Sequence, residues 1–339
     1  MVEVSTGCRR FRSFARPGHQ PVALLLIALA ALASSGCNTQ TSATTPARRI
    51  PAAWSVAERA GTLDLLGVDF VDANHGWAVG DIDPRGVGGA VFRTTDGGRH
   101  WTPLAARTEV STSVRFIDQR TGWIAGFAGR IDRSDDGGLS WRPQRPERGR
   151  EVFNSIWAVD GQCAWAAGVN GLGVRTTDGG STWIPMSLGA PVDFWSIRFV
   201  SPERGWAVGD GGVIVSTSDG GATWTPASSG TARALYALAL VSPEVVVAVG
   251  EGGMILRLDG GTRWTPVKSP VGAALYAVAA RGRTVWAVGA GGITIGSDDE
   301  GASWRAIAPL ANEKLTGLAL VDPDHGAAVG RRGYVQVLQ

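Results

Sequence analysis

Acidic residues and tyrosines are the side chains of this sequence that could do covalent chemistry on a substrate. Two facing carboxylates are the arrangement that hydrolyses glycosidic bonds, and a tyrosine can serve as a nucleophile. Three tyrosines are present, and Tyr236 and Tyr276 occupy equivalent places in the segments ALYALAL and ALYAVAA. The carboxylates available for a pair are Asp69, Asp81, Asp83, Glu109, Asp193, Asp210 and Glu251. Their spacing singles out no pair, so any chemistry depends on the elements that position them.

Histidine spacing gives little support to a metal site. His75 in DANHG and His325 in DPDHG share a register, and turn residues account for that coincidence. We therefore predict neither a metal site nor a cofactor.

A repeated phrase points to architecture. TTDGGRHW at residues 94–101 returns in five variants, and the six tryptophans are separated by 40, 42, 41, 40 and 40 residues. These tryptophans are Trp101, Trp141, Trp183, Trp224, Trp264 and Trp304. A catalytic motif is needed once per active site, whereas a fixed period of this length is typical of solenoids and propellers.

A second phrase of the GWAVG type occurs seven times, from residues 76–80 to residues 326–330. An apolar stretch precedes each copy, and a glycine turn with an alternating run follows most of them. Each unit therefore predicts four short antiparallel strands, with the DGG phrase between the third and the fourth. Four such strands in about 40 residues describe one blade of a β-propeller.

The two ends of the repeat region complement each other. After GYVQVLQ at residues 333–339 the sequence stops where a DGG turn would begin, whereas PAAWSVA at residues 51–57 resembles a fourth strand with Trp54 in the place of Trp101. Pairing the ends would remove free sheet edges. We predict an all-β fold over residues 51–339, a seven-bladed β-propeller of four-stranded antiparallel blades whose last blade is closed by the N-terminal strand.

The first 36 residues have the composition of a signal peptide. An arginine-containing start is followed by the apolar run at residues 22–33, which is too short to span a bilayer comfortably. The run ends at SSGC, which resembles a bacterial lipobox with Cys37 as the lipidated residue. Residues 37–50 then have a polar linker composition. We expect an exported, lipid-anchored protein on the periplasmic side of a membrane; the alternative is cleavage after Ala33 and a soluble periplasmic protein.

Removal of residues 1–36 takes away four arginines and Glu3, which changes the formal charge from +2 to −1. A nearly neutral chain has no general electrostatic attraction for nucleic acid, so no nucleic-acid partner is predicted. We expect a monomer.

The DGG phrase is similar to the Asp box of sialidases and related propellers. Its aspartates are Asp96, Asp136, Asp178, Asp219, Asp259 and Asp299. In Asp-box proteins this turn lies away from the catalytic centre, and an aspartate there can accept backbone N–H bonds. We therefore predict a structural role and no enzyme; a glycoside hydrolase or sialidase-like propeller is the alternative function.

A single exported propeller of GWAVG and TxDGGxxW repeats resembles the photosystem II stability and assembly factor family. The resemblance spans residues 51–339 and implies a non-enzymatic protein that binds newly made membrane subunits on the lumenal side through an arginine patch. The repeats do not decide whether the host is photosynthetic.

An arginine patch can be placed by the strand order. Turns between the second and third strands and the connectors between blades should share one face, opposite the DGG turns. On that face the predicted partner-binding residues, from blades 7, 1 and 2, are Arg85, Arg130, Arg145, Arg148, Arg150, Arg331 and Arg332. The alternative is ordinary solvated loop charge, partly neutralised by neighbouring acidic residues such as Glu147 and Glu151.

Overall fold

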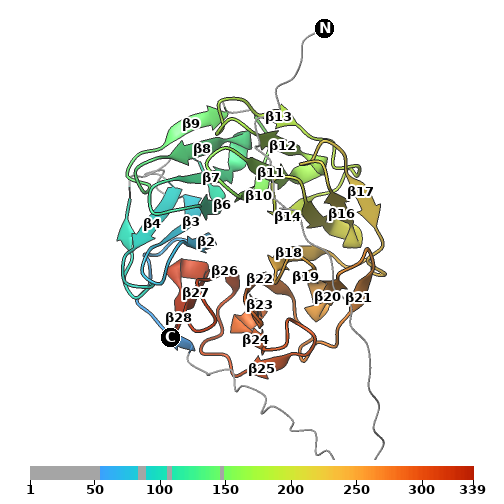
Figure 1. Ribbon diagram of the computed structural model, residues 1–339. Coiled ribbons are helices and arrows are strands. Elements are labelled where there is room, and N and C mark those ends of the chain that lie inside the picture. The colour runs from blue at the N-terminus through green and yellow to red at the C-terminus, as the bar shows by residue number, and fades with distance from the viewer. Residues whose placement is uncertain (1–53, 83–88, 105–108, 146–148) are drawn as a thin grey trace, which may run out of the picture. The chain divides into compact units, whose positions relative to one another are not determined.

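The computed structural model describes residues 54–82, 89–104, 109–145 and 149–339. In this part of the chain the strands form seven four-stranded antiparallel sheets, arranged as blades around a common axis (Figure 1). The predicted fold class is confirmed. The predicted signal peptide, Cys37 and the predicted linker lie outside the described residues. No helix in the described ranges is long and apolar enough to cross a membrane.

The blades follow one another along the chain, each from its inner strand outwards. Blades 1 to 3 are β2 (Leu65–Phe70), β3 (Gly76–Ile82), β4 (Gly89–Thr94) and β5 (Thr102–Pro103); β6 (Ser111–Phe116), β7 (Gly122–Gly126), β8 (Ile131–Ser134) and β9 (Arg142–Arg145); and β10 (Phe153–Ala158), β11 (Ala164–Gly168), β12 (Gly173–Thr176) and β13 (Ile184–Pro185). Blades 4 to 6 are β14 (Phe194–Phe199), β15 (Gly205–Gly209), β16 (Ile214–Thr217) and β17 (Thr225–Ala227); β18 (Leu235–Leu240), β19 (Val245–Gly250), β20 (Ile255–Asp259) and β21 (Trp264–Pro266); and β22 (Leu275–Arg281), β23 (Thr284–Gly289), β24 (Thr294–Ser297) and β25 (Arg305–Ile307). Blade 7 is β26 (Leu315–Leu320), β27 (Gly326–Gly330), β28 (Val335–Leu338) and β1 (Trp54–Val56).

The seventh blade is closed by the N-terminal strand, as predicted. Strand β1 runs antiparallel to β28, with Trp54 opposite Leu338 and Val56 opposite Gln336. Trp54 is buried and meets Trp286 of blade 6 edge to face, with ring centroids 5.5 Å apart. The first strand of the described chain thus covers the edge that the last strand would otherwise leave unpaired.

The hydrophobic core lies between neighbouring blades. Trp77 of blade 1 stacks on Phe116 of blade 2 with ring centroids 3.6 Å apart, and Trp165 of blade 3 stacks on Phe199 of blade 4 at 3.8 Å. Apolar strand residues such as Val114 and Ile124 complete the first of these contacts. The tryptophan that five of the seven GWAVG-type phrases contain therefore packs its blade against a neighbouring one, which explains its recurrence.

The two faces of the ring differ in the kind of turn that they carry. On one face, which we call the Asp-box face, the turn between the first and second strands bonds to the DGG turn, as Gly97 N–H donates to Asn74 O at 3.0 Å. On the other, which we call the connector face, short 3₁₀ turns follow the second strand of blades 2 to 7 within the described residues. They are η1 (Phe127–Gly129), η2 (Val169–Gly171), η3 (Asp210–Gly212), η4 (Glu251–Gly253), η5 (Ala290–Gly292) and η6 (Arg331–Gly333).

All seven inner strands carry a β-bulge after their first residue. The register shifts between Leu65 and Gly67 in blade 1, and at the equivalent place in the other six. A bulge turns an extra residue out of the ladder. The bulged residues, all of which line the central channel, are Leu66, Thr112, Asn154, Trp195, Tyr236, Tyr276 and Thr316. The equivalence of the two tyrosines is therefore a consequence of the repeat.

Candidate partner-binding face

The 3₁₀ turns η1, η2 and η6 of the connector face are each held by a backbone hydrogen bond to the connector that leads to the next blade. Gly129 N–H donates to Glu151 O at 2.7 Å, and Gly333 N–H donates to Leu63 O at 2.7 Å. The middle residue of each turn is left-handed, a conformation that costs a non-glycine residue free energy. Blades 4 to 6 have glycine there, whereas blades 2, 3 and 7 have Ala128, Asn170 and Arg332, with φ between 52° and 55°. The sequence thus puts a long cationic side chain at a position where glycine would be the relaxed choice.

Blade 7 presents two exposed arginines on this face. The carboxylate of Asp64 accepts a 2.9 Å hydrogen bond from the backbone N–H of Arg332, and the side chain of Arg331 approaches Asp64 only to 3.7 Å. Arg331 keeps 60% of its side chain exposed. The guanidinium of Arg332 makes no hydrogen bond or ion pair to any described residue. Both guanidinium groups therefore remain accessible to a ligand.

Two further cations join this part of the face and were missed by the sequence analysis. Arg59 donates to Arg332 O at 2.8 Å and pairs with Glu313 at 3.3 Å. Lys314 lies over the ring of Tyr276 at 4.2 Å, and burial followed by the nearby charge of Arg331 lowers the pKa of its amine. Both belong to connectors between blades, which the strand order already assigned to this face, so their position in the sequence was the available signal.

In blade 2 the guanidinium groups of two predicted arginines form ion pairs and hydrogen bonds within the protein. Arg145 is buried, pairs with Glu151 at 2.6 Å and donates to Gly129 O at 2.7 Å. Arg130 is mostly covered and pairs at 2.9 Å with Asp132, whose side chain is fully buried. Both fasten η1 to the blade, so they are poorly placed to meet a partner.

Arg150, in contrast, is exposed at the edge of a shallow groove of about 520 Å³ between the connector and η2. The groove is lined by Asn170, Leu172 and Met186 among others. Arg85 and Arg148 lie outside the described residues. Of the seven predicted partner-binding residues, the structure thus places Arg150, Arg331 and Arg332 with exposed side chains.

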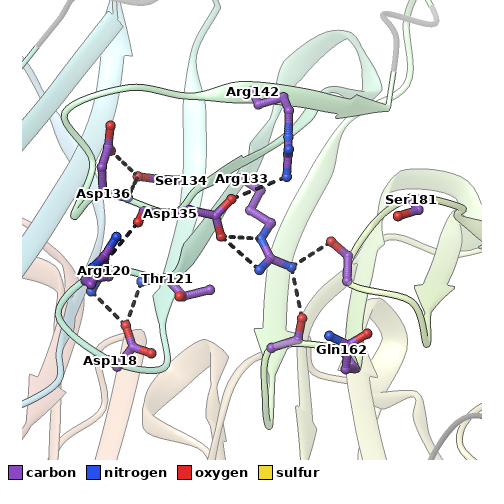
Figure 2. A network of polar contacts seen from close by, with 12 residues as sticks. Asp118, Arg120, Thr121, Arg133, Ser134, Asp135, Asp136, Arg142, Gln162 and Ser181 are labelled. Atoms are coloured by element: carbon purple, nitrogen blue, oxygen red, sulfur yellow. Dashed lines mark hydrogen bonds and ion pairs between the residues drawn. The ribbon is translucent and has the colours of Figure 1, made fainter.

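The Asp-box face uses its charged groups within the fold. Asp136 accepts from the hydroxyl of Ser134 at 2.8 Å (Figure 2). It also accepts from the backbone N–H of Ser140 at 2.9 Å. The same contacts recur around Asp96, Asp178, Asp219 and Asp299. Partial burial acts to raise the pKa of these carboxyls, but the hydrogen bonds outweigh it and lower the pKa, in Asp219 to about 2. Each aspartate is thus held as a charged acceptor at a blade corner.

Arginines of the third strands tie these corners to the next blade. Arg133 of blade 2 donates to Gly161 O at 2.9 Å and to Gly179 O at 2.8 Å in blade 3, while its Nε bonds to Asp135 (Figure 2). Arg175 of blade 3 donates to Gly220 O at 2.9 Å in blade 4 in the same way. The DGG turns therefore join neighbouring blades as well as closing their own.

Asp259, the aspartate of the fifth phrase, makes a different contact. It pairs with Arg257 at 2.6 Å. Arg257 stands where the other copies have serine or threonine. In the sheet Leu256 pairs with Pro266, whereas its blade 1 equivalent Arg93 pairs with Thr102, the equivalent of Thr265. The register between the third and fourth strands of blade 5 therefore differs by one residue. The sequence similarity of the phrase concealed this shift.

The carboxylates that could form a hydrolytic pair accept hydrogen bonds from different parts of the structure. Asp69 accepts from Phe116 N–H at 2.8 Å, Asp193 from Asn170 N–H at 2.8 Å, and Asp210 from the indole of Trp195 at 2.7 Å. Burial, followed by the charge of Glu251, raises the pKa of the Tyr236 phenol, which makes it a poorer nucleophile at neutral pH.

His75 and His325 each bond through Nδ1 to the aspartate of their own turn, at 2.9 and 2.8 Å. The described part of the chain contains no group of three or more histidine, cysteine, aspartate or glutamate side chains placed to hold a metal ion.

Comparison with known proteins shows sequence similarity to photosystem II assembly factors. A family described as photosynthesis system II assembly factor YCF48 matches residues 105–193. The photosystem II assembly lipoprotein Ycf48 of Synechococcus sp. (strain CC9902) is 30% identical over 128 residues, which make up 35% of this chain and 34% of the relative. The matched segment thus spans about a third of the length of that relative.

Solved structures extend the likeness in fold over the whole propeller. The structure of YCF48 bound to D1 peptide is 24% identical, with a TM-score of 0.68 over 84% of this chain and 94% of that chain. The structure of YCF48 from Cyanidioschyzon merolae is 22% identical, with a TM-score of 0.68 over 85% of this chain and 99% of that chain. At these identities the likeness shows the shared fold. In its repeats, in the matched segment and in its fold, the chain resembles the photosystem II assembly factors, as the sequence predicted.

Proposed function

We propose that this protein is a non-enzymatic binding module that captures membrane-protein subunits, or their exported segments, and assists the assembly or stability of their complex. The observation that carries the proposal is the exposed arginine set of the connector face, Arg150, Arg331 and Arg332. Arg331 and Arg332 stand on η6, which is bonded to a connector through Gly333 N–H, and Arg150 lies in the connector whose Glu151 O accepts from η1.

Arginine suits a surface of this kind. Its planar fork pairs bidentately with carboxylates and keeps its charge when partly desolvated. Rigid turns lose little conformational entropy when a partner binds, so more of the contact energy is available for affinity. Acidic or carboxylate-bearing loops and chain ends are the ligands that such a surface would recognise.

The relatives support the same kind of partner. The curated relative is named a photosystem II assembly lipoprotein, and one structure of the same fold has a D1 peptide bound. We infer for this chain a membrane-protein partner of corresponding chemistry, approached from the exported side of the membrane.

We also propose that Cys37 carries the lipid anchor, with residues 37–50 as a spacer between the membrane and a monomeric propeller. Stable anchoring needs more than one acyl chain, and a lipidated N-terminal cysteine would supply them. The Cys37→Ala variant should move from the membrane to the soluble periplasmic fraction. A wild-type protein that is already soluble there would contradict the anchor.

Binding without catalysis is tested by chemical crosslinking in native membranes, followed by identification of the captured proteins. The proposal expects one or a few membrane subunits, crosslinked to the connector face. Hydrolysis of sialosides or β-glucans by the purified protein would instead support the glycosidase alternative, since a shared propeller fold does not by itself decide function.

A further inference from the structure

The central channel contains a cluster of charged side chains that the connector face does not explain. The channel cavity has a volume of about 290 Å³. Its charged lining residues in the described chain are Asp69, Arg115, Arg198 and Arg281. Three arginines against one aspartate give this cluster a formal charge of about +2 at neutral pH.

The repeat geometry explains why these groups meet. Asp69, Arg115 and Arg198 are each the fifth residue of an inner strand, and Arg281 is the last residue of β22. Inner strands run from the connector face to the Asp-box face, so all four groups lie towards the Asp-box end of the channel. The fifth residues of blades 5 to 7 are Ala239, Ala279 and Ala319, which leave the space beside the arginines open.

Internal contacts hold the arginines in place without neutralising them. Arg115 and Arg198 both lie over the ring of Trp157, at 4.0 and 4.7 Å from its centroid. Arg115 approaches Asp69 only to 3.4 Å, and Arg198 donates to Ser155 Oγ at 3.1 Å and to Ile197 O at 2.8 Å. Asp69 is itself engaged by Phe116 N–H, so it positions Arg115 and balances one of the three charges.

Arg281 completes the cluster from blade 6. It donates to Val321 O at 3.1 Å and to Ala280 O at 3.2 Å. In Arg115, Arg198 and Arg281 the nitrogen Nη2 has no hydrogen-bond partner among the described residues, so each keeps donors for a ligand.

The net positive charge of the channel arginines is electrostatically unfavourable in the folded protein. Burial, followed by the charge of Arg115, lowers the pKa of Arg198 to about 10, and burial also lowers the pKa of Arg281. Both groups remain protonated at neutral pH. Like charges this close and partly desolvated repel each other, and a counter-ion between them would remove that cost.

We propose that this end of the channel is a binding site for a doubly charged oxyanion of the phosphate or sulfate type. Guanidinium forks match tetrahedral oxyanions in geometry, and two negative charges equal the net charge of the cluster. The cavity lies at the small end of the range of about 300–1,000 Å³ found for ligand pockets, which favours a small ion over a larger organic ligand.

The test is a thermal-unfolding titration of the purified full chain with sodium phosphate, sodium sulfate, sodium acetate or sodium chloride at matched ionic strength. A ligand that binds the folded state raises the melting temperature in a saturable way. The proposal expects saturation with phosphate and sulfate and no such effect with acetate or chloride. Equal curves for all four salts would overturn it.

Variants locate the site. Arg198→Gln should weaken the apparent phosphate affinity about tenfold or more, because it removes charge-assisted hydrogen bonds. Ala279→Leu should also weaken binding by filling the space while leaving the arginines intact, which keeps the test valid if Arg198→Gln fails to fold. The exposed Arg305→Gln serves as the matched control and should bind as the wild type does. Unchanged affinity in Ala279→Leu, or in a folded Arg198→Gln protein, would show that the anion does not bind in the channel.

Discussion

The two faces of the propeller carry the same number of repeats but use their charged side chains differently. On the Asp-box face, Asp136 and Arg133 are surrounded by hydrogen bonds to their own turn and to the next blade. On the connector face, Arg331 and Arg332 stand on a 3₁₀ turn where Asp64 is the one carboxylate of the described residues that bonds or pairs with them, and Arg59 donates to the carbonyl of Arg332. Charge that is bonded within the fold supports stability, whereas exposed, weakly paired charge is available for binding.

The same difference exists within the connector face. Arg145 and Arg150 are five residues apart in the sequence, yet Arg145 is buried against Glu151 and Arg150 is exposed. A count of arginines on a face therefore overstates the surface that a partner can meet. An arginine is available to a partner only if its guanidinium group is not already bonded to a carboxylate or carbonyl group of the protein.

Both faces depend on a closed ring, so the largest expected effect comes from opening it. Trp54→Ala should lower the free energy of unfolding by about 3–5 kcal/mol, the usual cost of removing a buried tryptophan. Deleting the chain through Val56 should cost more, because it also exposes the edge of β28. Denaturant unfolding measures both changes. A wild-type unfolding curve for the deletion would show that the ring does not need β1.

The comparison of faces predicts opposite responses to arginine removal. Arg133→Ala on the Asp-box face should cost about 2 kcal/mol, because two interblade carbonyls lose a charged donor. Arg332→Ala on the connector face should change stability by less than about 0.5 kcal/mol, as is usual for surface positions. Equal losses in the two variants would remove the distinction between bonded and available charge.

Acid should affect the Asp-box corners at low pH. The pKa of Asp219 is about 2 in the fold and 3.8 ordinarily, because hydrogen bonds outweigh the opposing effect of burial. The unfolded chain therefore takes up a proton at higher pH than the folded one. The stabilisation is complete above about pH 4 and is lost as the pH falls towards about 2.

The Asp219→Asn variant tests this effect. Its stability deficit relative to the wild type should be largest near about pH 5 and should shrink towards about pH 2. Melting temperatures across that range provide the measurement. A deficit that does not depend on pH would mean that the charge of the carboxylate is irrelevant to the corner.

Much of the fold was predictable because the same four-strand pattern occurs seven times in the sequence. The number of blades, closure through Trp54 and the assignment of turns to faces all follow from strand order. The hydrogen-bond and ion-pair partners of individual side chains could not be predicted from the strand order. The burial of Arg145 depends on the position of Glu151 in the connector that follows it, and the contact of Asp259 accompanies a strand register that differs by one residue in blade 5.

The bulged channel residues and the arginine cluster were also not predicted. They arise from seven inner strands that are far apart in the sequence and converge on one axis. A pattern within a single repeat contains no information about which side chains meet across that axis.

The most direct test of the proposed function compares matched arginine variants of the two faces in capturing the crosslinked membrane partner. One variant replaces Arg150, Arg331 and Arg332 with alanine; the control replaces three exposed arginines of the Asp-box face, Arg142, Arg263 and Arg283. Both lose three positive charges, so a general effect of net charge is the same in each. We expect the control to recover the partner as the wild type does, with a dependence on salt, and the connector-face variant to lose most of the recovery and of the salt dependence. Equal recovery by the two variants would contradict the account.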